Sequence, residues 1–438
     1  MSYNKLGALR FIEENDVKFI RLQFCDLFGN LKNISITSSQ LSKAFDEGIA
    51  FDSSSITGFN PIEDSELFLF PDPTTVCILP WRPQHGKVAR FFCDIRTTEG
   101  SPYKGDSRYI LKQVIEKSKE KGFIFKVGAK CEFFLFKTDS EGNPTLSPTD
   151  NAAYFDVAPL DQGENTRREI CLTLEQMGFQ VQSSHHEAAS GQHKIDFKYD
   201  DVLESADNIL SFKTVVKTIA GRNGLHASFM PKPFENSYGS GMHINMSLLK
   251  DGENIFKTST HETLPTIAEH FIAGILAHVK EMSAITNPTI NSYKRITSGF
   301  EAPRHICWSY KNRSSLIRIP STMNGYNRIE LRSPDSMCNP YLTLALMLTS
   351  GLDGIDNAIP LMPALTKNAY DMTDTELKYN NIDILPTTLK EAIEVMKEST
   401  LTKSVLGEEV FNSYLREKTE EWQAYNQTVH NWEIQKYL

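Results

Sequence analysis

A histidine-rich stretch combines side chains that can bind a metal ion. Ser184, His185, His186 and Glu187 are consecutive, and His193 follows six residues after Glu187. Imidazole nitrogens together with a carboxylate suit a divalent cation. The alternative is a group of polar residues on a loop or strand edge without a ligand, and clusters of this kind are common. The spacing alone leaves both interpretations open.

Two further features indicate an anionic ligand. The segment YGSGMH at 238–243 follows Lys232, and its glycines would let backbone N–H groups approach a phosphate; the alternative is a tight turn between strands. Residues 295–332 hold several arginines that alternate with apolar residues, so they would share a strand face. Protected guanidinium groups bind carboxylates or phosphates, and the alternative is a set of internal salt bridges. These arginines are Arg295, Arg304, Arg313, Arg318, Arg328 and Arg332.

Two carboxylates lie among apolar neighbours. Glu132 opens the aromatic run EFFLF, and Glu330 lies between Ile329 and Leu331. A carboxylate in such surroundings needs a partner, either an arginine or a metal ion. With the histidines and arginines, these residues indicate a pocket for a phosphate-bearing substrate and a divalent metal, as in an ATP-using ligase or kinase.

The elements that must position these residues fall into two parts. Residues 4–15 predict a short helix, and the β-rich runs 18–26 and 31–37 flank a Gly-Asn turn that favours a hairpin. Strand-like runs alternate with turns over 66–98, so the first hundred residues predict a small α+β unit. The polar stretch 97–107 is typical of a linker.

The larger remainder mixes strands with amphipathic helices. No G-x-G-x-x-G follows a strand, which argues against a Rossmann fold, and the strands outnumber those of a βαβ repeat. We expect strands at 123–136, 226–234, 243–249, 316–320 and 327–332, and helices at 167–179, 264–286, 339–355 and 407–427.

Composition excludes several classes of protein. The 438 residues carry a net charge of −9, which argues against a nucleic-acid binder led by bulk electrostatics. No apolar run of about 20 residues and no signal-peptide pattern is found, so we expect no membrane association. The seven cysteines are scattered and contain no C-x-x-C pair, which indicates reduced thiols and a cytoplasmic location.

Specific segments carry a resemblance to a known family. They include FIRLQFCDLFGNLKN, YFDVAPLDQGEN, SHHEAASGQHKIDFKY, HASFMPKPF, GSGMH, FEAP, NRSSLIRIP, RIELR and VHNWEIQKYL. In these segments, which spread over nearly the whole chain, the sequence resembles a type I glutamine synthetase of the Gram-positive bacterial kind. The resemblance implies an α+β chain with an N-terminal β-grasp domain (1–100) and a large α/β catalytic domain (101–438). It also implies a dodecamer of two hexameric rings, with each active site between two subunits.

The resemblance implies the ATP-dependent ligation of ammonium to glutamate, through phosphorylation of the γ-carboxylate. Two divalent ions, Mg²⁺ or Mn²⁺, support this reaction in the family. The family pattern assigns catalysis to Asp52, Glu301, Arg313 and Arg332; substrate binding to Arg295, Gly239 and Arg318; ATP binding to Tyr199, Ser247, Arg318 and Arg328; and metal binding to Glu132 and Glu187 for one ion and to His243 and Glu330 for the other.

The chain departs from the family pattern at the residues that carry the chemistry. Lys130 and Lys194 stand where the family has glutamate ligands, one for each metal ion. Gln182 replaces a carboxylate near ATP, and Tyr238 replaces an asparagine that contacts glutamate. Exchanging a carboxylate for an ammonium beside a dication costs on the order of ten kcal/mol before relaxation, since a unit-charge pair at 4 Å is worth about 4 kcal/mol at an effective dielectric constant of 20.

The remaining charges suggest what replaces the metal. Glu132, Glu187 and Glu330 with the two lysines sum to a charge of −1. We therefore expect the ammonium groups to lie roughly at the metal positions and to pair with these glutamates. Because lysine is not a Lewis acid, phosphoryl transfer would lose its main electrostatic support.

Three interpretations follow. The first is a glutamine synthetase family protein with severely impaired ligase chemistry and a regulatory or assembly role, as a homo-oligomer or mixed with an active paralogue. The second is an active ligase with altered metal use or another amine or acid substrate, which Tyr238 would fit. The third is a drifting duplicate with no selected role.

Overall fold

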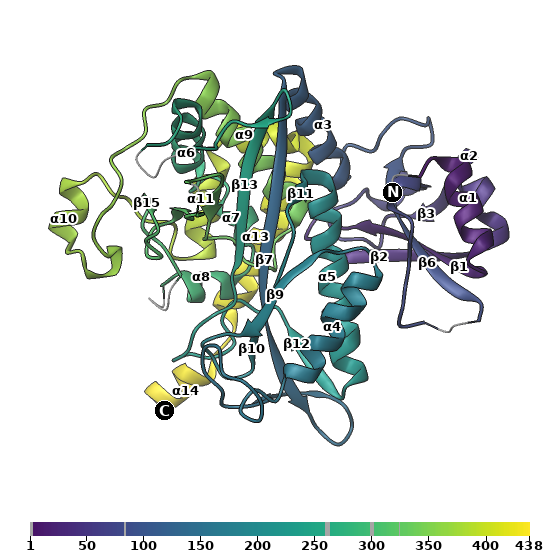
Figure 1. Ribbon diagram of the computed structural model, residues 1–438, viewed down its shortest axis with the longest axis horizontal. Helices are drawn as coiled ribbons and strands as arrows, with labels where there is room; N and C mark the ends of the chain where they lie inside the picture. Colours follow the sequence, from purple (N-terminus) through teal and green to yellow (C-terminus); the bar gives the residue numbers. More distant parts are fainter. Residues whose placement is uncertain (1–2, 83–84, 259–262, 298–301, 324) are drawn as a thin grey trace.

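The computed structural model of the chain describes residues 3–82, 85–258, 263–297, 302–323 and 325–438. Its strands form a smaller sheet, drawn in purple and blue at the right of Figure 1, and a larger sheet at the centre. Glu301, one of the expected catalytic residues, lies outside the described residues.

The smaller sheet belongs to the N-terminal part of the chain and has the order β2-β1-β6-β4-β3, with β5 paired to β6. β1 and β2 form the expected antiparallel hairpin, whereas β1 and β6 run parallel. The Asp26 carboxylate closes the hairpin turn by accepting hydrogen bonds from the N–H groups of Phe28 and Asn30 at 3.0 and 2.8 Å. The elements are α1 (Lys5–Glu14), β1 (Val17–Cys25), β2 (Leu31–Thr37), η1 (Ser38–Gln40), α2 (Leu41–Asp46), β3 (Ile49–Asp52), η2 (Ile62–Asp64), β4 (Glu66–Pro71), η3 (Pro73–Thr75), β5 (Cys77–Ile78) and β6 (Lys87–Arg96).

The larger sheet has the order β15-β16-β17-β13-β7-β10-β9, and the long strand β7 also pairs with β8, β11 and β12. β7 and β13 run antiparallel along nine paired residues, which makes them the backbone of the sheet. The strands are β7 (Phe123–Thr138), β8 (Pro144–Pro148), β9 (Val181–His186), β10 (Gln192–Phe197), β11 (Asp200–Asp201), β12 (Leu225–Ser228), β13 (Met242–Lys250), β14 (Glu253–Asn254), β15 (Trp308–Tyr310), β16 (Ile317–Ile319) and β17 (Ile329–Leu331).

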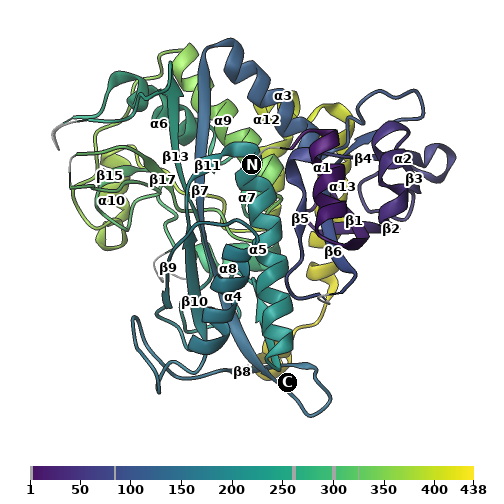
Figure 2. The same ribbon diagram turned by 45° about the vertical axis from the view of Figure 1, so that its right-hand side comes forward.

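Helices cover one face of this sheet. α3 and α5 pack against β7, and α9 packs against α3, α5 and α6 (Figure 2). The helices are α3 (Ser107–Glu120), α4 (Glu164–Gln176), α5 (Val202–Arg222), α6 (Thr266–His278), α7 (Ser283–Thr286), α8 (Ile290–Thr297), α9 (Pro340–Asp356), η4 (Ala369–Asp371), α10 (Asp374–Tyr379), α11 (Leu389–Lys397), α12 (Thr400–Leu406), α13 (Glu408–Gln427) and α14 (Asn431–Tyr437). Among the residues described, no helix is both long and apolar enough to cross a membrane.

Alternation along the strands separates the core from an open face. Every odd-numbered residue of β7 from Phe123 to Leu135 is buried in the main hydrophobic core. On β13 the even-numbered residues from Met242 to Leu248 are buried in the same core. Because successive strand residues point to opposite faces, the residues between them, Lys130 among them, face away from the helices.

A buried ion cluster joins the two sheets. Arg108, at the start of α3, contacts Asp72 and Asp94 of the N-terminal part at 2.9 and 2.8 Å and Asp207 of α5 at 3.0 Å. The side chain of Arg108 is 3% exposed, and the carboxylates outweigh burial and raise its pKa. The cluster fixes the start of α3 between the two parts of the chain.

Two expected elements differ from the structure. The expected strand 226–234 ends at Ser228, because Pro231 and Pro233 have no N–H group for a sheet. The expected helix 264–286 is divided into α6 and α7 by a turn at 279–282.

Candidate functional site

Strand pairing brings charged residues of the open face together. Lys194 of β10 lies directly opposite Glu132 of β7. Lys130, two residues earlier on β7, lies opposite Asp196 of β10 on one side and His243 of β13 on the other. Opposite residues of antiparallel strands carry their side chains on the same face, so the register alone collects these five groups.

Lys194 forms a buried ion pair with two carboxylates. Its Nζ lies 3.0 Å from Glu132 Oε1 and 3.3 Å from Glu187 Oε1, and its side chain is 11% exposed. Burial opposes the charge on Lys194, but the two carboxylates outweigh burial and raise its pKa above the usual range. The pairing expected from the charges is thus present for Lys194.

Both carboxylates also have other donors. Glu132 Oε2 accepts a hydrogen bond from the N–H of Gly241 at 2.8 Å, and His185 Nε2 lies 3.2 Å from Glu187 Oε1. Burial would raise the pKa of Glu187, but His185 and Lys194 lower it below the ordinary value. Fixed protein groups therefore hold Glu187 as a carboxylate.

Lys130 is held less tightly. Its Nζ lies 3.8 Å from Glu330 Oε1 and 3.9 Å from Asp196 Oδ2, beyond ordinary hydrogen-bond length. Burial lowers the pKa of Lys130, and the two carboxylates offset part of this effect. The ammonium group thus has ion pairs but, among the residues described, no acceptor at hydrogen-bond distance.

Cations surround Glu330, whose side chain is 1% exposed. Arg318 Nε lies 2.7 Å from Glu330 Oε2, and Arg332 Nε lies 3.9 Å from the same oxygen. Burial would raise the pKa of Glu330, but Arg318, Lys130 and Arg332 lower it overall. Nη1 of Arg332 is buried without a hydrogen-bond partner in the described part of the chain. Three cations thus face one carboxylate.

The glycine-rich segment packs against Arg295. A Cβ atom at Gly241 would lie 2.5 Å from Nη2 of Arg295, and one at Gly239 would lie 3.1 Å from its Cγ. Only glycine therefore leaves room for this guanidinium. His243 follows the segment, and burial and the charge of Arg332 lower its pKa well below the usual range, so its imidazole is neutral.

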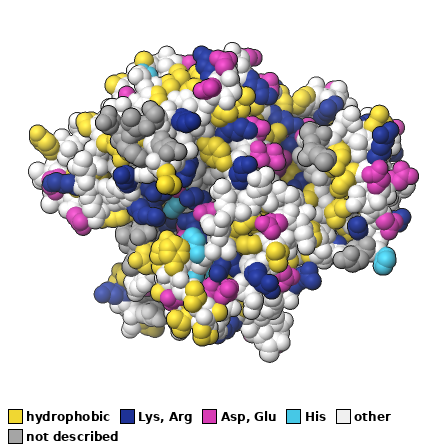
Figure 3. Space-filling model, in the orientation of Figure 1, with side chains coloured by type: hydrophobic (Ala, Val, Ile, Leu, Met, Phe, Trp, Pro, Cys, Tyr) yellow, Lys and Arg dark blue, Asp and Glu magenta, His cyan; other side chains and the backbone are white. Residues whose placement is uncertain are grey.

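A cavity of about 380 Å³ opens beside Lys130. Its wall carries two further cations, Lys198 and Arg328, together with the ring of Tyr199. The hydroxyl of Tyr199 is hydrogen bonded to Ser247, so of the expected ATP-binding residues Tyr199 and Arg328 line the cavity and Ser247 lies behind Tyr199, whereas Arg318 does not line it. On the face turned toward the viewer in Figure 3, Lys and Arg side chains gather in the part of the molecule that holds β15 and α8.

Two expected catalytic residues lie away from this group. Asp52 ends β3, an edge strand of the smaller sheet. Its carboxylate accepts a hydrogen bond from the N–H of Ser54 at 2.9 Å, which lowers its pKa. Arg313 is exposed between β15 and β16. Within one chain, therefore, neither residue contacts the Lys194 ion pair.

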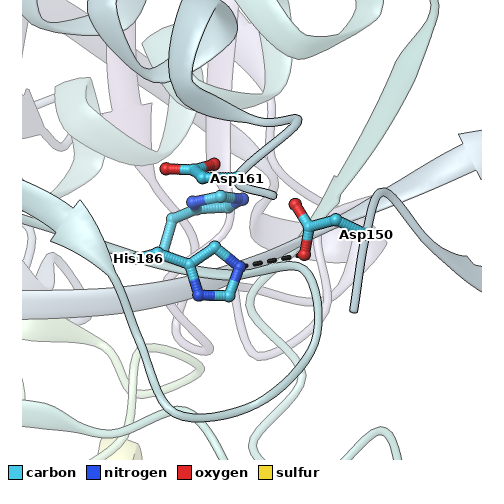
Figure 4. A group of neighbouring side chains, drawn as sticks. Asp150, Asp161 and His186 are labelled. Carbon is cyan, nitrogen blue, oxygen red and sulfur yellow. Dashed lines mark hydrogen bonds and ion pairs between the residues drawn. The ribbon is translucent and has the colours of Figure 1, made fainter. Parts of the chain in front are cut away.

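The histidine-rich stretch divides between two surroundings. His185 faces Glu187, whereas His186 and His193 join Asp150 and Asp161 in a buried group whose potential ligand atoms lie within 4.8 Å of one another. In Figure 4 a dashed line joins the ring of His186 to the carboxylate of Asp150, and the carboxylate of Asp161 lies above this pair.

Arg167 already supplies a positive charge to this buried group. Its Nη1 lies 2.7 Å from Asp161 Oδ2 and 2.9 Å from His193 Nδ1. His186 Nε2 lies 3.0 Å from Asp150 Oδ1, and this contact raises the pKa of His186 in spite of burial. Arg167 thus supplies the positive charge that a metal ion would bring, which favours the interpretation without a ligand, although His193 Nε2 has no hydrogen-bond partner among the described residues.

Sequence reasoning missed Asp196. It lies two residues after Lys194 on β10, and this spacing puts both side chains on the same face of a strand. Asp196 supplies Lys130 with its second carboxylate. Strand periodicity could have revealed it.

Divalent metal ions do not fit the residues present. An ion between Glu132 and Glu187 would lie beside the ammonium of Lys194, which already contacts both carboxylates. At an effective dielectric constant of 20, a dication 4 Å from an ammonium is repelled by about 8 kcal/mol. At the second expected position, Glu330 is already bound by Arg318.

Comparisons with known proteins cover the whole chain. The family model of the glutamine synthetase catalytic domain matches residues 104–437, and that of the glutamine synthetase β-grasp domain matches residues 16–98. The α+β fold with an N-terminal β-grasp domain is thereby confirmed.

Individual relatives agree with this assignment. The chain is 51% identical to a glutamine synthetase of Clostridium saccharobutylicum over 437 residues, which cover 100% of this chain and 99% of the relative. A cryo-EM structure of Plasmodium falciparum glutamine synthetase superimposes with a TM-score of 0.89 at 27% identity, over 100% of this chain and 99% of that chain. A GmaS/ADP complex superimposes with a TM-score of 0.89 at 30% identity, over 98% of this chain and 99% of that chain. The chain therefore belongs to the glutamine synthetase family, whose reaction is the ATP-dependent formation of glutamine.

Proposed function

We propose that this chain is a glutamine synthetase family member with severely impaired ligase chemistry and a regulatory or assembly role. The ion pair of Lys194 with Glu132 and Glu187 carries this proposal. A tethered ammonium can neutralise carboxylates, but it cannot polarise a phosphoryl oxygen as a Lewis acid does. The family's divalent-metal chemistry therefore has no support at this place.

The arginines that the family uses for its substrates are retained, whereas two of its metal-ligand glutamates are replaced by Lys130 and Lys194. We assign glutamate and phosphate handling to Arg295, Arg313, Arg318 and Arg332, and the protection of an intermediate to Glu301. Nη1 of Arg332 is buried and has no hydrogen-bond partner among the described residues, which supports an anionic group beside it. Gly239 keeps the segment close to Arg295, as described above.

ATP is the nucleotide that we assign to the cavity with Tyr199, Ser247, Arg318 and Arg328. The ADP complex of GmaS supports this assignment, because that protein has the same fold over its whole length.

An assembly role is supported by the exposed end of the chain. α14 and the residues next to it in the chain expose large apolar side chains. The exposed fractions are 70% for Val429, 59% for Trp432 and 75% for Tyr437. Such side chains require a partner surface. We propose a dodecamer, either of this chain alone or mixed with an active paralogue, in which Asp52 serves a neighbouring subunit.

Glutamine formation from glutamate, ammonium and ATP tests the proposal. The natural chain should form no glutamine above background with Mg²⁺ or Mn²⁺, whereas the double variant Lys130→Glu/Lys194→Glu should turn over. The Lys126→Glu variant is the control, because Lys126 lies on the same face of β7 and pairs with the largely exposed Asp201. Turnover of the natural chain at ordinary enzyme rates would contradict the proposal.

A second candidate is an active ligase for another amine or acid substrate. Tyr238 favours it, since this residue packs with Phe134 and Phe136 beside the glycine-rich segment. A panel of amines in the same assay distinguishes the two candidates, because the second predicts turnover with one of them.

A further inference from the structure

The open face carries more positive charge than its carboxylates neutralise. Glu330 and Asp196 are surrounded by Lys130, Arg318 and Arg332, and the cavity adds Lys198 and Arg328. Five cations thus face two carboxylates, and the excess favours an anionic ligand with several charges.

Two of these cations have donors to spare. The Nη1 of Arg332, whose residue is 2% exposed, has no hydrogen-bond partner among the described residues. Lys130 Nζ lies 3.8 and 3.9 Å from its carboxylates, so it neutralises them without close hydrogen bonds. A buried donor without an acceptor is costly in a folded protein. Arg332 does not line the cavity, however, so of these two cations Lys130 is the one placed to meet a ligand there.

The opposite end of the cavity suits an aromatic, hydrogen-bonding group. Tyr199 packs on the backbone of Gly128, where a Cβ atom would lie 3.0 Å from the Tyr199 ring. The amides of Asn245, Asn254 and Asn327 line the same cavity. A nucleobase has a flat face for stacking and polar edges for amides.

The strand register sets the distance between these two ends. The Tyr199 ring packs on Gly128, two residues from Lys130. Its hydroxyl binds Ser247, which lies four residues along β13 from His243, the residue opposite Lys130. Two to four residues of a strand span about 7 to 13 Å. A nucleoside with two or three phosphates extends over a comparable length.

We propose that this site binds a nucleoside di- or triphosphate without any divalent ion, with Lys130 as the cation that the phosphates meet. Lys194 cannot take this part, since it is already bound to Glu132 and Glu187 at 3.0 and 3.3 Å. This inference rests on the proposed loss of metal binding and on the assignment of ATP to the cavity, and it adds that the nucleotide binds without a metal ion and that Lys130 meets its phosphates.

Calorimetric titration of the natural, full-length chain with ADP tests the proposal. We expect the dissociation constant in EDTA to lie within threefold of that in Mg²⁺, and adenosine to bind at least tenfold more weakly than ADP. A loss of ADP affinity of tenfold or more in EDTA would overturn the proposal, and so would the absence of ADP binding in both buffers.

Two matched variants test the part of Lys130. Lys130→Met keeps most of the side-chain length but removes the charge, and it should weaken ADP binding in EDTA at least tenfold. Lys126→Met, on the same face of β7 and paired with Asp201, should change ADP binding less than twofold. Equal effects of the two substitutions would contradict a specific role for Lys130.

The outcome is independent of the ligase assay. If the natural chain forms glutamine but binds ADP equally in EDTA and Mg²⁺, the proposed impairment is wrong and nucleotide binding without metal stands. If it forms no glutamine and binds ADP only with Mg²⁺, the proposed impairment stands and nucleotide binding without metal is wrong.

Discussion

Replacing Lys194 with methionine should destabilise the protein, because it leaves two carboxylates without their cation. Glu132 and Glu187 lie 3.0 and 3.3 Å from Lys194 Nζ, and each attraction amounts to about 5 kcal/mol at an effective dielectric constant of 20. Protonation of a glutamate at pH 7 limits the cost to about 4 kcal/mol for each carboxylate. The variant is also relieved of the cost of burying a lysine, so we expect a net loss of about 3–5 kcal/mol.

Urea unfolding followed by tryptophan fluorescence measures this loss. All variants are compared at one protein concentration, because assembly contributes to the apparent stability. Lys126→Met is the matched control: its Nζ lies 2.9 Å from Asp201, but that carboxylate is 58% exposed, so the loss should stay below about 1 kcal/mol. If Lys194→Met cost no more than this control, the buried ion pair would not form in solution and the argument built on it would fail.

Three further substitutions test other parts of the fold. Arg108→Met should lower stability by about 3–5 kcal/mol in the same urea assay, because it leaves the buried carboxylate of Asp207 unpaired; a loss below about 1 kcal/mol would contradict this. Burial raises the pKa of Asp106 to about 7, so the folded chain binds a proton here more tightly than the unfolded chain does. This group therefore stabilises the folded chain at low pH. As pH rises from about 4 to 7, its contribution to the free energy of unfolding falls by up to about 1.4 kcal/mol per pH unit. Asp106→Asn should remove that slope from unfolding midpoints measured between pH 5 and 8, and an unchanged slope would refute the assignment. Gly29→Ala should cost about 1–3 kcal/mol, because Gly29 has φ +82° and a Cβ would lie 2.8 Å from Cα of Asn339; thermal unfolding equal to that of the natural chain would contradict this contact.

Local pattern predicted the strand at 123–136 and the need of Glu132 for a partner of opposite charge. The structure adds that Glu132 lies on the face opposite the core and that Lys194 lies directly across from it. The resemblance to the family supplied the reason for grouping these residues. The charges of the side chains then predicted the ion pair that the structure contains.

Residues whose partners lie far away in the sequence could not be predicted in this way. His186 and His193 are close in sequence to Glu187, yet they contact Asp150 and Arg167, which the fold brings from the segment after β8 and from α4. Residue spacing also gave no reason to group Asp52 with the residues of the larger sheet; its service to a neighbouring subunit is our proposal and rests on the resemblance to the family.

Binding of Mn²⁺ tests the central claim that tethered ammonium groups have replaced the metal ions. In calorimetric titration the natural chain should bind no stoichiometric Mn²⁺, because Lys194 already contacts Glu132 and Glu187. The double variant Lys130→Glu/Lys194→Glu should bind Mn²⁺. If the natural chain binds one or more equivalents of Mn²⁺ with micromolar affinity, the ammonium groups do not exclude the metal and the account is wrong.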